Sequence, residues 1–142
     1  MLPNKPCVLP NRTIPAHIVV EGGAHGVTFD NCSFRHLGGT ALHFHAGAQH
    51  SSVVGSTFDD VSASAVIIGN VTDWDEQDAS RQTLNISVSD SVIRDLPREY
   101  HGAVALAVFI AANTSILYNE ISGCSYRCAC ADNSTCAHSL CT

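Results

Sequence analysis

The residues most suited to chemistry lie in one polar segment, GNVTDWDEQDASRQT, at residues 69–83. It holds the only tryptophan of the 142-residue chain, Trp74, among the four acids Asp73, Asp75, Glu76 and Asp78. Clustered carboxylates raise one another's pKa, so that one acts as an acid while another stays ionised, as glycoside hydrolysis requires. An indole packs well on a sugar ring. The segment predicts catalytic carboxylates beside a substrate-binding Trp74, and a solvated charged loop is the alternative.

A second candidate segment is PREYHG, at residues 97–102. Glu99 and His101 are predicted as general acid or base residues, and Tyr100 as a substrate contact. Joint action with the acidic segment requires both to lie on the same edge of the fold, and separate edges are the alternative.

Metal binding has weaker support. Alternating oxygen ligands suit calcium, but DWDEQD lacks the glycine and the distal glutamate of an EF-hand. His43 and His45 share a strand face, yet the residues 24 positions on, Ile67 and Gly69, have no ligating side chain. We predict no metal and no cofactor, with calcium as the alternative, and expect the histidines to form a partly exposed polar face.

The elements that position these residues repeat along the chain. Phe29 and Phe34 recur 24 positions later as Val53 and Phe58. Two further copies place Val88 with Ile93 and Ile116 with Ile121, and the five-residue step is kept in all four. Apolar residues recur at i and i+2, the period of a strand. A unit of three short strands must stack on its neighbours to bury its apolar face. The fold class is therefore all-β, a parallel β-helix of about four coils.

Four stretches carry a family resemblance: FDNCSFRHLGGTALHF, NISVSDSVIRDL, YHGAVALAVF and TSILYNEISGCSY. Over residues 26–126 the chain resembles the right-handed parallel β-helix proteins of the pectate-lyase-like superfamily, which includes polysaccharide lyases and glycoside hydrolases. The resemblance implies activity on cell-wall or matrix polysaccharide. No catalytic motif of that family matches here position by position.

In the subgroup that the chain resembles most, a glycine- and tryptophan-rich coil follows the stretch corresponding to NEISGCSY. Here RCACADNSTCAHSLCT follows instead. We expect an irregular segment at 1–16, β-helix coils at 17–126 and an irregular cysteine-rich tail at 127–142. We also expect the chain to be a fragment of a longer β-helix or a truncated product.

Six of the eight asparagines lie in N-x-[ST] sequons: Asn11, Asn31, Asn70, Asn85, Asn113 and Asn133. This excess predicts a secreted, N-glycosylated protein. The alternative is that asparagines at the corners of a β-helix hydrogen-bond in stacks. The N-terminal residues lack the apolar core of a signal peptide.

Composition excludes two classes of partner. The longest apolar run, AVALAVFIAA, has 10 residues, too few to span a membrane. A net charge of −6 with 7 unclustered Lys and Arg argues against nucleic acid. The expected partner is a polysaccharide or oligosaccharide. The expected function is that of a secreted polysaccharide lyase or glycoside hydrolase, against a non-catalytic carbohydrate-binding or structural module or an inactive truncated product.

Overall fold

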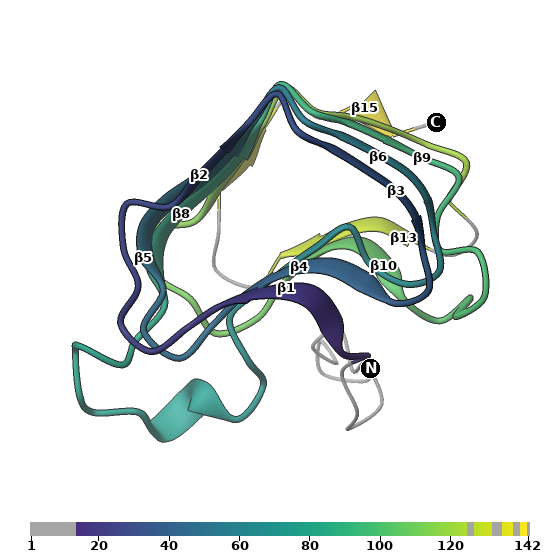
Figure 1. Ribbon diagram of the computed structural model, residues 1–142. Coiled ribbons are helices and arrows are strands. Elements are labelled where there is room, and N and C mark those ends of the chain that lie inside the picture. The colour runs from purple at the N-terminus through teal and green to yellow at the C-terminus, as the bar shows by residue number, and fades with distance from the viewer. Residues whose placement is uncertain (1–13, 125–126, 132–134, 138–139, 142) are drawn as a thin grey trace, which may run out of the picture.

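The computed structural model describes residues 14–124, 127–131, 135–137 and 140–141. Within them the strands form three parallel sheets, which enclose one interior when the molecule is seen along its axis (Figure 1). Sheet A contains β1 (Ala16–Val20), β4 (Thr40–Phe44), β7 (Val66–Ile68), β10 (Val104–Val108) and β13 (Arg127–Ala131). Sheet B contains β2 (Thr28–Asp30), β5 (Gln49–Val54), β8 (Leu84–Ser89), β11 (Ser115–Leu117) and β14 (Thr135–Ala137). Sheet C contains β3 (Ser33–Leu37), β6 (Thr57–Val61), β9 (Val92–Arg94), β12 (Glu120–Ser122) and β15 (Leu140–Cys141).

Each coil contributes one strand to each sheet, and every strand pair is parallel. Phe34 pairs with Phe58, Phe58 with Ile93, and Ile93 with Ile121. These are the partners that the 24-residue repeat predicts. The all-β fold and its stacked coils are therefore confirmed.

The interior is lined by alternate residues of each strand. Leu42 and Phe44 of β4 stack on Val66 and Ile68 of β7, and all four side chains are fully buried. Burial of an aliphatic or aromatic side chain of this size contributes about 1.5–3 kcal/mol to stability. The large apolar residues that define the repeat in the sequence thus form the continuous core.

Residues with left-handed backbone conformation form three columns, and each column marks a bend of the chain that recurs from coil to coil. The columns are Gly26, His50, Asn85 and Asn113; Asn31, Gly55, Asp90 and Tyr118; and His36, Asp60, Asp95 and Gly123, all with φ between 51° and 71°. Glycine, asparagine and aspartate tolerate this region better than other residues. The polar residues at the corners thus serve the backbone turn as well as solvation.

The corner between sheets B and C also carries a ladder of side-chain hydrogen bonds. The backbone N–H of Cys32 donates to Ser56 Oγ at 3.2 Å, and that of Ser56 donates to Ser91 Oγ at 3.2 Å. The N–H of Ser91 donates to Asn119 Oδ1 at 3.0 Å, while Asn119 Nδ2 donates to the carbonyl of Val88 at 2.9 Å. Each of these side chains therefore links its own coil to the preceding one.

The charged columns run along the outside of sheet C. Asp59 lies in register between Arg35 and Arg94, as the repeat predicts, and its carboxylate is 3.9 Å from Arg94 Nη2. Asp60 contacts His36 Nδ1 at 2.7 Å and Arg98 Nε at 3.3 Å. Exposed pairs of this kind contribute little to stability individually.

The C-terminal segment differs from the expectation of an irregular tail at 127–142. Its described parts form β13, β14 and β15, which pair in register with β10, β11 and β12. This additional coil lacks the large apolar residues by which the repeat was traced in the sequence, so the pattern did not reveal it. At the other end, residues 1–13 of the segment expected to be irregular lie outside the described residues. No helix of the described chain is long and apolar enough to cross a membrane.

Candidate active site at the corner between sheets A and B

The acidic segment forms the longest connection between sheets A and B in the described chain. Residues 69–83 link β7 to β8 and contain the short 3-10 helix η1 (Asp73–Asp75). In Figure 1 this loop projects beyond the outline that the other coils share at this corner. The insertion adds 11 residues to the repeat, because the step from Phe58 to Ile93 is 35 residues instead of 24. We call residues 69–83 the acidic loop.

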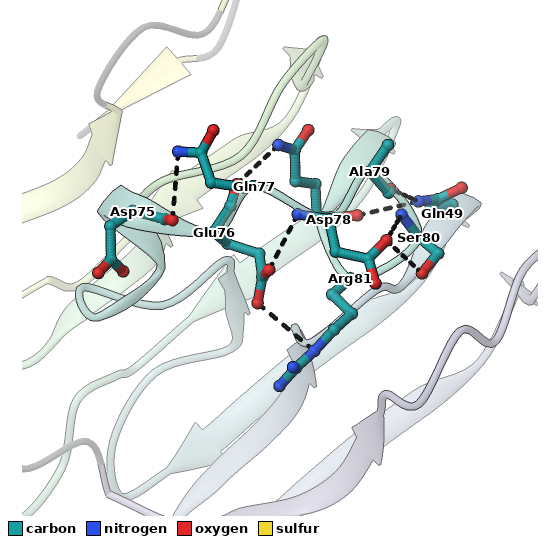
Figure 2. A network of polar contacts seen from close by, with 9 residues as sticks. Gln49, Asp75, Glu76, Gln77, Asp78, Ala79, Ser80 and Arg81 are labelled. Atoms are coloured by element: carbon teal, nitrogen blue, oxygen red, sulfur yellow. Dashed lines mark hydrogen bonds and ion pairs between the residues drawn. The ribbon is translucent and has the colours of Figure 1, made fainter.

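Two carboxylates hold the acidic loop in shape (Figure 2). Asp78 accepts hydrogen bonds from Ser80 N at 2.9 Å and Ser80 Oγ at 2.7 Å, which lower the pKa of its exposed carboxyl. Glu76 Oε1 accepts from Asp78 N at 3.0 Å, and its Oε2 lies 3.4 Å from Arg81 Nε. Both groups are therefore engaged within the loop, and Asp78 in particular is held as an anion.

Gln49 of β5 ties the acidic loop to the coil before it. Its Nε2 donates to the carbonyl oxygens of Ala79 at 2.9 Å and Gln82 at 3.1 Å. Gln82 Nε2 in turn donates to the carbonyl of Glu76 at 2.9 Å. These bonds fix the second half of the loop against the scaffold, as a precise site requires.

Asp73 differs from the other acids of the loop. Its Oδ2 atom is buried and has no hydrogen-bond partner among the described residues. Burial raises the pKa of this carboxyl, and the neighbouring Glu76 adds to the effect, while His45, a hydrogen bond from the Thr72 side chain and Arg81 oppose it. A carboxyl with a raised pKa retains a proton at higher pH than usual, which is the property of a general acid.

His45 lies close enough to Asp73 to act on its carboxyl, and His45 in turn contacts His43 and Glu21. The rings of His43 and His45 stack at 4.3 Å between centroids, and His43 Nε2 is hydrogen-bonded to the carbonyl of Gly69 at 2.9 Å. Burial lowers the pKa of His43, so its ring is neutral near pH 7. His45 Nε2 lies 3.1 Å from Glu21 Oε2. We call Glu21, His43, His45 and Asp73 the His–acid corner.

The sequence interpretation missed Glu21, although a signal for it was present. Glu21 and His45 are 24 residues apart, and each directly follows the sheet A strand of its coil. The repeat therefore places them in one column. Charge is densest in the acidic insertion, whereas this column holds a single acid, so the density of charge does not point to it.

The remaining candidates of the acidic loop are less enclosed. The Asp75 side chain is exposed. Trp74 has its backbone in η1, but its side chain lies outside what the structure describes. The substrate-binding role of Trp74 stays a prediction.

The second segment lies at a different corner. Glu99, Tyr100 and His101 are exposed in the connection from β9 of sheet C to β10 of sheet A, which enters sheet A at the start of its strands. The acidic loop leaves sheet A at the end of its strands. The N–H groups of Glu99 and Tyr100 donate to the carbonyl of Ser62 at 3.2 Å and 3.0 Å. Ser62 directly follows β6 of sheet C, so these bonds hold the connection next to that strand's end. The structure therefore does not bring the two segments together.

The predicted glycosylation positions divide into three groups. Asn85 and Asn113 are exposed and lie in a left-handed column, as Asn31 does in another. Asn70 is partly buried at the start of the acidic loop, where its Oδ1 accepts from Thr72 N at 3.5 Å. Asn11 and Asn133 lie outside the described residues. The stacking role considered as the alternative is filled at Asn119, which belongs to no sequon, and also at Asn85, whose Nδ2 lies 2.7 Å from Nδ1 of His50 in the preceding coil.

In the described part of the chain, no three His, Cys, Asp or Glu side chains are grouped so that they could hold a metal ion. No such group of side chains therefore supports calcium binding in that part of the chain. Comparisons with protein-family models, curated proteins and solved structures find no match to this chain. The fold is thus assigned from its own strand pairing, and the site from its own geometry.

Proposed function

We propose that the protein is a secreted carbohydrate-active β-helix of the pectate-lyase-like type, which cleaves glycosidic bonds at the His–acid corner. The observation that carries the proposal is the buried, unpartnered Oδ2 of Asp73, whose pKa is raised beside an acid-paired histidine. Its support in the sequence is the resemblance to polysaccharide lyases and glycoside hydrolases. Its support in the fold is the fixed, inserted loop that carries Asp73.

The proposed reaction is hydrolysis. Protonated Asp73 donates its proton to the glycosidic oxygen while the bond between that oxygen and the anomeric carbon breaks. The Glu21 carboxylate, positioned by His45, removes a proton from the water that attacks the anomeric carbon. A lyase would instead need a base that abstracts a carbon-bound proton. The raised pKa of Asp73 suits a proton donor, so it favours the hydrolase over the lyase.

The test uses the full chain with soluble plant cell-wall and extracellular-matrix polysaccharides. We expect new reducing ends without the ultraviolet absorbance of unsaturated sugars. Asp73→Asn removes the proton donor and should lower the rate by about 10²-fold to 10⁴-fold. Asp75→Asn, an exposed acid in the same helix, is the matched control and should leave the rate within about twofold. An unchanged rate in Asp73→Asn would refute the assignment, and unsaturated products would replace the hydrolase by a lyase.

A non-catalytic carbohydrate-binding module is the second candidate. The observation that favours it is the internal bonding of Glu76 and Asp78, which uses two of the four loop acids for structure. This candidate predicts retention of the chain in affinity electrophoresis on a polysaccharide gel, with no product formed. Retention that is equal in the wild type and Asp73→Asn would favour it over the enzyme.

Secretion with N-glycosylation is part of the same proposal. The exposed side chains of Asn31 and Asn113 support it, because an oligosaccharyl group needs an accessible asparagine. Intact mass of the natural polypeptide before and after enzymatic removal of N-glycans tests it. A mass that does not change on this treatment would contradict it.

A further inference from the structure

The first coil exposes part of the core that later coils bury. Its strands β1, β2 and β3 are the terminal strands of their sheets, so one edge of each has no neighbour among the described strands. Its apolar residues pack against the core but are only partly buried: Ala24, Val27, Phe29, Phe34 and Leu37. In the next coil, the partners of Phe29, Phe34 and Leu37 are Val53, Phe58 and Val61, all with 0% exposure. We call this surface the first-coil face.

The ladder of side-chain hydrogen bonds at the corner between sheets B and C reaches the first-coil face at Cys32. Ser56 and Ser91 each donate to the carbonyl two residues before them, and each Oγ accepts from the preceding coil. Cys32 Sγ donates to the carbonyl of Asp30 at 3.5 Å, the same local bond. Its free, partly buried thiol therefore stands where the later side chains reach the coil before them.

The pattern of apolar residues by which the coils are traced is not found in the sequence of residues 1–13. The residues 24 positions before Phe29 and Phe34 are Lys5 and Pro10. Neither supplies an interior apolar side chain for a strand, and proline cannot donate to a ladder of backbone hydrogen bonds. A partner that completes this face must bring both strand edges and apolar residues.

We infer that the first-coil face binds the same face of a second copy of this chain, related by a two-fold axis. Such an axis passes through Ile18, the centre of β1, and through the corner between Asn31 and Cys32. It sets β1 antiparallel to its copy, with Ile18 against Ile18, whose side chain is interior in register yet 40% exposed. It sets β2 antiparallel to the copy's β3, because these strands flank that corner at equal distances.

The face is complementary to itself under this axis. Phe29 and Phe34 lie at equal distances from the corner, so each ring meets the other residue of the copy. Asp30 on the outer side of β2 comes diagonal to Arg35 of the copy's β3, at a distance that side chains of this length can bridge. Neither Asp30 nor Arg35 takes part in an ion pair within residues 14–124. A self-complementary patch of this kind gives a closed dimer.

Sedimentation equilibrium of the full chain tests the inference. We expect a mass of twice 15.0 kDa for the wild type and 15.0 kDa for Ile18→Lys. The control is Ile110→Lys, since Ile110 is also 40% exposed but lies after β10, and this variant should remain a dimer. A monomeric wild type would overturn the inference and leave the face to residues 1–13 or to another chain. Masses above the dimer would overturn the two-fold arrangement in favour of head-to-tail stacking.

A charge exchange keeps the inference falsifiable if Ile18→Lys does not fold. Arg35→Glu opposes Asp30 of the copy at both symmetry-related contacts and should weaken association by about 30-fold, as expected for two exposed pairs worth about 1 kcal/mol each. The double variant Asp30→Arg with Arg35→Glu should restore wild-type association. Failure of this restoration would overturn the predicted strand pairing.

Chemical crosslinking locates the axis. A short bis-maleimide should link Cys32 to Cys32 of the copy, identified by peptide mapping of the crosslinked dimer. A dimer crosslinked only through other cysteines would place the contact elsewhere and overturn the inference. Because none of these measurements involves carbohydrate, the outcome is independent of the proposed enzymatic activity.

Discussion

Two corners of the β-helix follow different rules. At the corner between sheets B and C, two residues always separate the strands: 31–32, 55–56, 90–91 and 118–119. At the corner between sheets A and B, the connections range from residues 45–48 to residues 69–83. The first corner has the same length in every one of these coils, whereas the second accepts an insertion that carries the candidate site.

The difference follows from how each corner bonds to its neighbours. The B–C corner has a side chain in each coil that reaches the backbone of the preceding coil, so a change in length would break bonds to two coils. At the A–B corner the side-chain links between described coils are isolated, such as Val27 N–H to Ser51 Oγ and Asn85 Nδ2 to His50 Nδ1, and the acidic loop bonds to itself and to Gln49. Functional insertions in a solenoid therefore belong at the corner without the ladder.

The largest effect is expected when the length rule is broken directly. One glycine inserted between Asp90 and Ser91 shifts β9 against β6 and β12, which turns interior residues outward. We expect loss of cooperative unfolding in circular dichroism. One glycine inserted after Gln77 in the acidic loop should leave the unfolding curve close to the wild type. Equal damage from both insertions would contradict the contrast between the corners.

A smaller effect is expected when one rung of the ladder is removed. Asn119→Ala leaves the N–H of Ser91 and the carbonyl of Val88 buried without their side-chain partner. We expect a loss of about 1–3 kcal/mol in the free energy of unfolding, measured with urea. The matched control is Asn113→Ala, which removes an exposed asparagine from a left-handed corner and should cost less than about 1 kcal/mol. A smaller loss in Asn119→Ala than in Asn113→Ala would show that the ladder does not stabilise the corner.

The smallest effect concerns the titration of the A–B corner. Burial holds the pKa of His43 below its usual value of 6.5, so below that pH the unfolded chain binds a proton that the folded chain does not. The contribution of His43 to stability is therefore complete above pH 6.5 and falls as the pH drops through and below that value. His43→Gln keeps an N–H donor for the carbonyl of Gly69 but does not titrate. The difference in stability between wild type and His43→Gln, measured by urea unfolding at several pH values, should decline below pH 6.5; a constant difference would contradict this account.

The sequence was sufficient to predict the coils because large interior residues repeat at fixed spacing. Phe34, Phe58, Ile93 and Ile121 occupy one column in both the pattern and the structure. The final coil could not be predicted in this way, because the partners of Leu106, Ile116 and Ile121 are the small residues Ala129, Cys136 and Cys141, at shorter spacing. Ile121 pairs with Cys141, which is 20 residues away and not 24.

The site was predictable only in part. Density of charge identified the acidic loop, but not which of its acids would be buried, because that depends on how the loop folds back on the scaffold. The carboxylate of Asp78 accepts two hydrogen bonds from Ser80, whereas Asp73 is bonded by the Thr72 side chain and leaves its Oδ2 buried without a partner among the described residues. The pairing of Glu21 with His45 follows from the repeat, whereas the separation of the acidic loop from Glu99 and His101 follows from the strand order of sheet A.

The stacking of the coils also determines which part of the molecule is best protected against local unfolding. Each coil is hydrogen-bonded only to its immediate neighbours, so its protection against local unfolding depends on whether it has one neighbour or two. The third coil, β7 to β9, has a described coil on either side, and its core residues Val66, Ile68, Val88 and Ile93 are fully buried. Amide hydrogens there should exchange with solvent last. The acidic loop departs from the third coil, so Asp73 is carried by the part of the chain that remains folded longest.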